Sequence, residues 1–235
     1  MLKNFNCSQI LFIDIETVPS YYKYEELPDR IKFFWDKKSS QLKQDSELSE
    51  FNYQRAGIYA EFGKIICISA GIILPDKNFR LKSFYGDDEK KILLDFKEML
   101  DKYYACEDKF LCAHNGKEFD YPYIARRMLI NRINLPAILD ISGKKPWEVR
   151  HLDTLELWKF GDYKNYTSLD LLTEIFNIPS PKDDIDGSMV AKVYYEDKDL
   201  KRIADYCEKD VLAVAQLFLS FKNMELIDPA KVITT

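Results

Sequence analysis

Apolar and polar positions along this chain follow strand-like patterns first and helix-like patterns later. Residues 10–13 form an unbroken apolar run, which is typical of a central strand buried on both faces. Asp14, Ile15 and Glu16 then alternate, which places both carboxylates on one face at the C-terminal end of that strand. Further apolar runs predict four more strands, the last of them weaker: 64–74, 79–85, 110–113 and 149–153.

Apolar residues three and four positions apart predict helices in the rest of the chain. Asp87 and Asp88 are expected to cap one helix, whose apolar positions run from 92 to 103. The other predicted helices are 121–130, 169–176, 189–195 and 200–219. Hairpin strands come first, and strands and helices then alternate. We therefore predict an α/β fold with a mixed, mostly five-stranded sheet flanked by helices.

A charged and aromatic stretch at about 20–57 separates the first two strands. Pro28 predicts the start of a helix in it, and a polar segment runs from Lys37 to Glu50. Long excursions from an acidic strand end are often lids or substrate clamps. We predict one domain spanning residues 1–235, with this stretch as a polar insertion.

Composition narrows the class of protein. The chain is 46% hydrophobic and 31% charged, which is ordinary for a globular protein. It has no apolar run long enough to span a bilayer and no signal-peptide pattern, so we expect no membrane association. Its net charge of −5 argues against a protein that coats duplexes, and any contact with nucleic acid should be local. Bound divalent cations would locally reverse the charge of an acidic cleft.

The five cysteines are an odd number and contain no C-x-x-C pair. Cys67, Cys112 and Cys207 each lie inside an apolar segment, which predicts buried free thiols. Free thiols are typical of a reducing compartment, so we expect a cytoplasmic protein.

Four carboxylates form the candidate chemistry. Asp14 and Glu16 end the first strand, and Asp120 follows a buried strand and a glycine turn. Asp210 lies beside the apolar stripe of the last helix, four residues after Tyr206 and on the same face. An isolated carboxylate in such positions is costly unless it is paired or bound to metal. If the four converge, they would form a two-cation site of the kind that hydrolyses phosphodiesters.

Simpler roles remain open for several of these residues. Asp120 could cap the following helix, and Tyr206 with Asp210 could be a surface pair. His114 is either a general base or, more often at the end of an apolar strand, a packing residue. Asp153 either faces the site or caps a helix.

The order of three motifs is more specific than any one of them. The motifs are D-I-E-T after an apolar strand, N-x-x-x-F-D, and Y-x-x-x-D on a late helix. Together they resemble the DEDD superfamily of 3′–5′ exonucleases, in the DEDDy subgroup that has a tyrosine four residues before the last aspartate. Within it, the chain most resembles the proofreading exonuclease domain of family B DNA polymerases, over roughly residues 8–219. We expect a stand-alone exonuclease, because no polymerase sequence follows Leu219.

This resemblance implies a ribonuclease H-like fold and two Mg²⁺ or Mn²⁺ ions. By analogy, Asp14 bridges both metals, and Glu16 and Asp210 complete the metal that holds the attacking water. Asp120 holds the second metal, directly or through water, and Tyr206 orients the nucleophile.

Substrate contacts are expected from two places. The motif residues Thr17, Asn115 and Phe119 are candidates beside the acids. Farther along, positive charge adjoins an aromatic surface at Lys144, Lys145 and Trp147, which could track a single strand. Solvated lysines beside a packed tryptophan are the alternative.

The sequence thus predicts a metal-dependent enzyme that removes nucleotides from a single-stranded 3′ end. The polymerase-like resemblance favours DNA. An RNA 3′-end-processing exonuclease and a noncatalytic nucleic-acid-binding module on the same fold are the alternatives. The presence of all four carboxylates and the tyrosine favours an enzyme. Repair or replication proteins are the partners such an enzyme would have.

Overall fold

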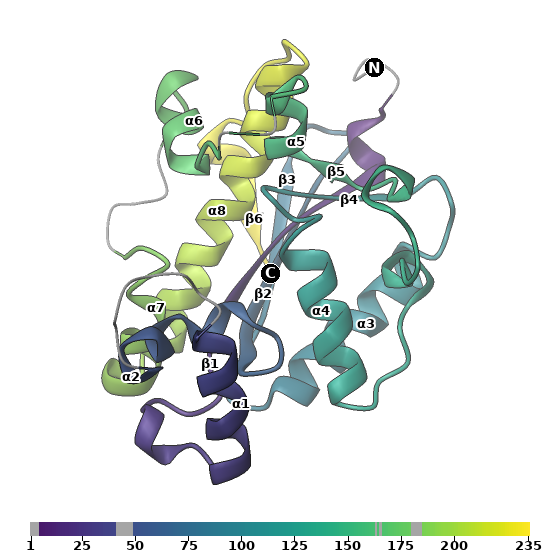
Figure 1. The fold of residues 1–235 in the computed structure, drawn as a ribbon. Helices are drawn as coiled ribbons and strands as arrows, with labels where there is room; N and C mark the ends of the chain where they lie inside the picture. The colour runs from purple at the N-terminus through teal and green to yellow at the C-terminus, as the bar shows by residue number, and fades with distance from the viewer. Residues whose placement is uncertain (1–4, 41–48, 163, 165, 180–184) are drawn as a thin grey trace.

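The computed structural model describes residues 5–40, 49–162, 164, 166–179 and 185–235. In these residues the strands form one mixed sheet in the order β5-β4-β1-β2-β3-β6 (Figure 1). β1 pairs antiparallel with β2 and parallel with β4, so it lies inside the sheet. The strands are β1 (Ile10–Pro19), β2 (Gly63–Ile73), β3 (Phe79–Tyr85), β4 (Phe110–Ala113), β5 (Leu152–Asp153) and β6 (Val232–Thr234).

Helices cover both faces of the sheet. The α-helices are α1 (Asp29–Ser39), α2 (Ser49–Asn52), α3 (Glu89–Tyr103), α4 (Asp120–Ile130), α5 (Thr154–Lys159), α6 (Leu169–Ile175), α7 (Val190–Lys192) and α8 (Leu200–Phe221). α7 continues into a π-helical turn at Val193–Asp197. Short 3₁₀ turns lie at Cys7–Gln9, Tyr24–Glu26, Tyr53–Ile58, Ala137–Leu139, Pro146–Glu148 and Pro229–Lys231. In Figure 1, α8 lies on one side of β1 and α4 on the other.

The alternation along β1 separates the two sides of the core. Leu11, Ile13 and Ile15 belong to the cluster that includes α3 and α4. Ile10 and Phe12 belong to the cluster that includes α8. Because strand side chains alternate between faces, Asp14 and Glu16 face α8 as Phe12 does.

The mixed sheet confirms the predicted fold class, with two differences in the strands. Six strands form the described sheet, because β6 pairs in parallel with β3. A three-residue strand near the chain end has no alternation long enough to reveal it, and its pairing depends on a distant partner. The last predicted strand, 149–153, is reduced to Leu152–Asp153.

The insertion at about 20–57 packs around an aromatic cluster that it shares with the residues just after it. Pro28 precedes α1 as its N-cap residue, as predicted. Trp35 of α1 is fully buried, and its ring packs against Tyr53, Tyr59 and Phe62. Part of the predicted polar segment, residues 41–48, lies outside the described residues.

A buried ion pair fastens α3 and α4 to the sheet. The Arg127 guanidinium donates to both carboxylate oxygens of Glu89, at 2.8 and 2.6 Å, and to the Ala60 carbonyl at 2.7 Å. Glu89 also accepts from the Ile65 amide at 2.7 Å and from Asn131 at 2.9 Å. Removing one partner of a buried pair typically costs about 3–5 kcal/mol, because the other charge is left without compensation.

All five cysteines are free, and Cys67, Cys112 and Cys207 are fully buried, as predicted. Among the described helices, none combines the length and apolar character needed to cross a membrane.

Candidate metal centre

The first two acids lie on the face of β1 that α8 covers. Asp14 is partly buried and Glu16 is buried, and both continue the alternation that begins at Ile10. Glu16 lies opposite Cys67 of β2, and a register shift follows between Glu16 and Thr17. The strand therefore presents two carboxylates toward the helix before its pairing becomes irregular.

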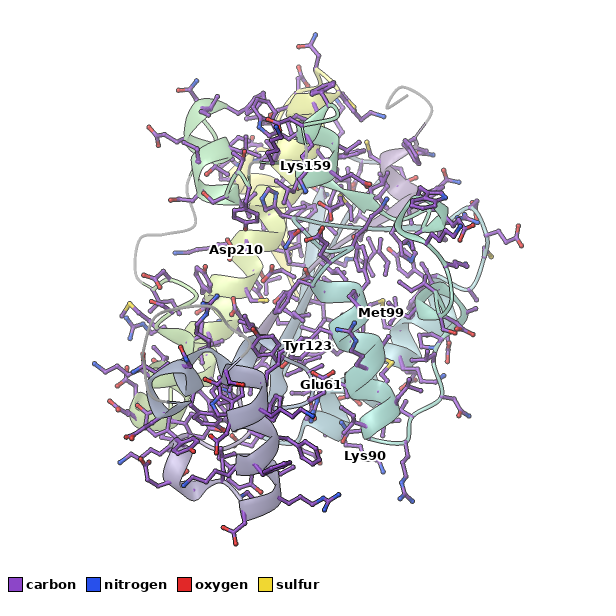
Figure 2. The ribbon with its side chains drawn as sticks, viewed as in Figure 1. Glu61, Lys90, Met99, Tyr123, Lys159 and Asp210 are labelled. Carbon is purple, nitrogen blue, oxygen red and sulfur yellow. The ribbon has the colours of Figure 1, made fainter. Side chains whose placement is uncertain are left out.

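Helix α8 brings three polar groups against this strand end. The Cys207 thiol donates to Asp14 Oδ2 at 3.3 Å and lies 3.4 Å from the Asp14 carbonyl oxygen. Tyr206 is buried, and its phenol forms a hydrogen bond with Asp210. Figure 2 labels Asp210 on the middle of α8. The charges of Glu16 and Asp14 also act on the Tyr206 phenol, so the predicted shared face of Tyr206 and Asp210 is turned toward β1.

Asp120 lies at the start of α4 and is 3% exposed. The alternative that it caps this helix is wrong, because Phe119 occupies the N-cap position and no side-chain cap is formed. Backbone groups of Asp120 and Ile15 donate to the Asp120 carboxylate. Its Oδ1 atom is fully buried and has no hydrogen-bond partner. A buried oxygen without a partner costs about 1–3 kcal/mol, so a water molecule or a cation at this atom would be stabilising.

The glycine between β4 and α4 lets this loop turn tightly. A Cβ on Gly116 would lie 2.5 Å from the Cβ of Ala113 and 2.9 Å from the Tyr121 ring. Only glycine fits this approach, which carries the chain from the end of β4 to Asp120.

Burial and mutual repulsion perturb the carboxylates strongly. Burial, followed by the charge of Asp210, raises the pKa of Asp14 well above its usual range. The same two causes raise the pKa of Glu16. Burial raises the pKa of Asp120 to about 8, and Asp210 contributes to that shift. The four acids from β1, α4 and α8 therefore lie close enough to interact.

The donor set fits a divalent metal. Ligand atoms of Asp14, Glu16 and Cys207 lie within 4.8 Å of one another. Hard cations such as Mg²⁺ and Mn²⁺ prefer carboxylate oxygens, which Asp120 and Asp210 also offer. The buried Oδ1 atom of Asp120 supports this fit, because a cation would satisfy it.

Cys207 is the residue of this site that the sequence did not single out. It was expected only as a buried thiol in the apolar stripe of the last helix. Its position directly after Tyr206, and three residues before Asp210, was the available signal.

Asp153 and His114 both have structural partners. The Asp153 carboxylate accepts from the amides of Asn115 at 2.9 Å and Lys117 at 3.0 Å. It also caps α5 through the amides of Leu155 and Glu156. The His114 ring lies 2.9 Å from the Thr154 hydroxyl and 2.9 Å from the Thr167 carbonyl, and burial lowers its pKa. Asp153 therefore acts as a helix cap, and His114 is a partly buried packing residue with both ring nitrogens hydrogen-bonded.

Three predicted substrate contacts lie near the acids along the chain. Thr17 follows Glu16, and its hydroxyl is hydrogen-bonded to Tyr123. Phe119 precedes Asp120, and its ring lies 5.3 Å from the Tyr123 ring. Asn115 has a positive φ of 63°, and its amide is held by Asp153.

The other three predicted contacts are exposed and lie elsewhere. Lys144 and Trp147 line a cavity of about 730 Å³, together with Asn115. The Lys145 ammonium lies 5.2 Å from the centre of the Trp147 ring. None of the four candidate metal-binding carboxylates lines this cavity.

We predict that the stability of the metal-free protein falls with rising pH. Unfolded carboxyl groups ionise near pH ~4, whereas folded Asp120 keeps its proton to about pH 8. Between these values the folded chain binds more protons, so the free energy of unfolding decreases as the pH rises. Mg²⁺ binds the ionised form and should stabilise the protein more at pH 8 than at pH 5. Urea unfolding in EDTA and in Mg²⁺ measures both effects.

Asp120→Asn should flatten this pH dependence, because it removes one of the shifted groups. Asp101→Asn, on the exposed face of α3 and away from the four acids, is the control for loss of one negative charge and should retain the fall in stability with rising pH. A metal-free stability that rises between pH 5 and pH 8 would contradict the assignment.

Two comparisons with known proteins bear on this fold and site. Residues 58–229 match a family model described as a predicted 3′–5′ exonuclease related to the exonuclease domain of PolB. Asp120, Tyr206 and Asp210 lie within the matched residues, whereas Asp14 and Glu16 precede them.

The second comparison is with solved structures. The fold is similar to part of the family B DNA polymerase from the hyperthermophilic archaeon Pyrobaculum calidifontis, with a TM-score of 0.52 and 15% sequence identity. The match covers 91% of this chain and 24% of that polymerase, so this chain spans about a quarter of its length. This likeness confirms the predicted ribonuclease H-like fold. Because the family model matches more than half of the chain, the protein belongs to the family of predicted 3′–5′ exonucleases related to the PolB exonuclease domain.

Proposed function

We propose that this protein is a DEDDy-type exonuclease that hydrolyses phosphodiester bonds from the 3′ end of single-stranded nucleic acid, with DNA as the favoured substrate. The observation that carries the proposal is the convergence of four carboxylates from β1, α4 and α8, with one buried oxygen of Asp120 left unpartnered. In a purely structural cluster, each carboxylate would be expected to lie beside a cationic side chain. Here the carboxylates of Asp14, Glu16, Asp120 and Asp210 repel one another, and bound cations would remove that repulsion.

Asp14, Glu16, Asp120 and Asp210 would hold two Mg²⁺ or Mn²⁺ ions. When bound, such ions activate water as a nucleophile and stabilise the attacking and leaving oxygens of an in-line displacement. The Cys207 thiol holds the Asp14 carboxylate in one orientation through its hydrogen bond to Oδ2. β1 and α8 thus fix the acids before substrate arrives, which lowers the cost of organising the site.

Tyr206 acts as a positioning group in this proposal. Burial and the nearby acids raise the pKa of its phenol, so the phenol stays protonated at neutral pH. A neutral phenol orients an oxygen by hydrogen bonding and does not serve as a base. Its hydrogen bond with Asp210, one of the proposed metal ligands, supports this role.

Single-stranded ends are the favoured substrates for a physical reason. The terminal nucleotide must be splayed toward the carboxylates, and unpairing it costs about a few kcal/mol in a duplex but little in a free strand. The family relationship to polymerase exonuclease domains favours DNA. RNA processing is the alternative substrate class, and the first experiment distinguishes the two.

We expect 3′-labelled DNA oligonucleotides to lose their label first in Mg²⁺ or Mn²⁺, and 5′-labelled ones to shorten progressively. Ca²⁺ should support binding but little cleavage, because its longer bonds and looser geometry misplace the reacting oxygens. Parallel RNA oligonucleotides report the sugar preference.

Asp14→Ala should lower the rate roughly a thousandfold or more, since it would remove one of the carboxylates proposed to hold the ions. Asp101→Asn, which is exposed on α3, is the control for loss of one negative charge. Full activity in excess EDTA, or an active Asp14→Ala variant, would refute the proposal.

Tyr206→Phe and Asp210→Asn should separate positioning from metal binding. Tyr206→Phe keeps the ring packing but loses one hydrogen bond, so we expect a rate loss on the order of a hundredfold. Its Mn²⁺ affinity, measured by calorimetry, should stay close to that of the wild type. Asp210→Asn should weaken both the rate and Mn²⁺ binding. If Tyr206→Phe loses Mn²⁺ or keeps the wild-type rate, the assigned role of the phenol is wrong.

A further inference from the structure

The cavity of about 730 Å³ beside α4 is separate from the four carboxylates, and we call it the lateral groove. One wall is the outer face of α4, where Pro122, Arg126 and Leu129 lie at steps of four and three residues. Asp120 shares its face of the helix with the buried Ile124, so the carboxylate points away from the groove. The opposite wall comes from residues 135–159. Figure 2 labels Lys159 of this wall, the last residue of α5.

The lateral groove is joined to the carboxylates by the loop that precedes α4. Asn115, Lys117 and Glu118 line the groove, and the same loop leads directly to Asp120. The Asp153 carboxylate accepts the amides of Asn115 and Lys117 and also caps α5. Both walls and the approach to Asp120 are therefore fixed relative to one another.

The charge of the lateral groove is opposite to that of the whole chain. Four lining side chains are cationic: Lys117, Arg126, Lys144 and Lys159. Three are acidic, but Asp153 is buried under four backbone donors and Glu156 forms an ion pair with Lys117 at 2.6 Å. Four cations and three acids give the lining a formal charge of +1, in a chain with a net charge of −5. This groove suits an anionic ligand.

The lateral groove also offers surfaces for bases. Two apolar side chains that line the groove are exposed: Trp147 (75%) and, on the α4 wall, Leu129 (61%). Stacking of a base on an aromatic side chain contributes about 1–3 kcal/mol and does not depend on the base. Cationic side chains around an exposed tryptophan therefore fit the phosphates and bases of a single strand better than an acidic peptide, which would leave the ring without a stacking partner.

We propose that the lateral groove binds the nucleotides that lie upstream of the 3′ terminus while the terminal phosphodiester lies at the carboxylates. This inference rests on the proposed function, and it adds a second contact for the same strand. The strand passes over the loop that contains Asn115 and Phe119. Substrates long enough to reach the groove bind more tightly, whereas a dinucleotide uses the carboxylate site alone.

The test compares Arg126→Glu/Trp147→Ala with a matched control, Lys102→Glu/Tyr103→Ala. The control pair also joins a cation to an exposed aromatic ring, 5.0 Å apart, with Tyr103 57% exposed on α3. For a DNA oligonucleotide of about twelve nucleotides, the groove variant should raise KM roughly tenfold to a hundredfold, as expected for loss of one stacked base and one phosphate contact. Its kcat, and its KM for a dinucleotide, should match those of the wild type and the control.

Direct binding keeps this test independent of catalysis. Fluorescence anisotropy of the labelled oligonucleotide in Ca²⁺ should show the same loss of affinity in the groove variant and none in the control. If the wild type does not cleave, the proposed function fails, and anisotropy still decides whether the groove binds the strand. Equal affinity of wild type and groove variant would overturn the inference, and would leave a protein segment as the occupant. An equal loss on the dinucleotide would also overturn it, because the groove would then contact the terminal nucleotide.

Discussion

The cost of gathering negative charge at the end of β1 is the constraint on which the rest of the structure depends. Burial removes water from Asp14, Glu16 and Asp120, and each neighbouring charge raises the pKa of the others. An isolated strand end would relax this repulsion by turning its side chains outward. Here β1 is held between β2 and β4, and α8 packs on it through Cys207. The fold thus keeps the acids together in spite of their repulsion.

Other buried acids of this chain have a different environment. Glu89 is fully engaged by Arg127, Asn131 and a backbone amide. Asp153 accepts four backbone amides and holds the loop before α4. Asp120, in contrast, keeps one buried oxygen without a partner. Both carboxylate oxygens of Glu89 and of Asp153 have protein partners, whereas Asp120 Oδ1 has none among the described residues, which supports the proposal that a cation binds there.

The strand and helix patterns of the sequence predicted which side chains share a face of one strand or one helix. The apolar run and alternation of β1 fixed the shared face of its two acids, and the helical period of α8 predicted the shared face of Tyr206 and Asp210. Contacts between distant segments could not be predicted, such as the thiol of Cys207 on Asp14 or the pairing of β6 with β3. The capping alternative for Asp120 failed because the helix begins one residue earlier than a cap at that position requires.

Counting the Mn²⁺ ions that the protein binds tests the central idea most directly, namely that these carboxylates form a two-cation site. Electron paramagnetic resonance during a Mn²⁺ titration at about pH 8, where Asp120 ionises, measures free and bound ions. We predict saturable binding that approaches two ions per chain in the wild type and in Asp101→Asn, with loss of binding in Asp14→Ala. Absence of saturable binding, or unchanged binding in Asp14→Ala, would contradict a metal centre at the end of β1.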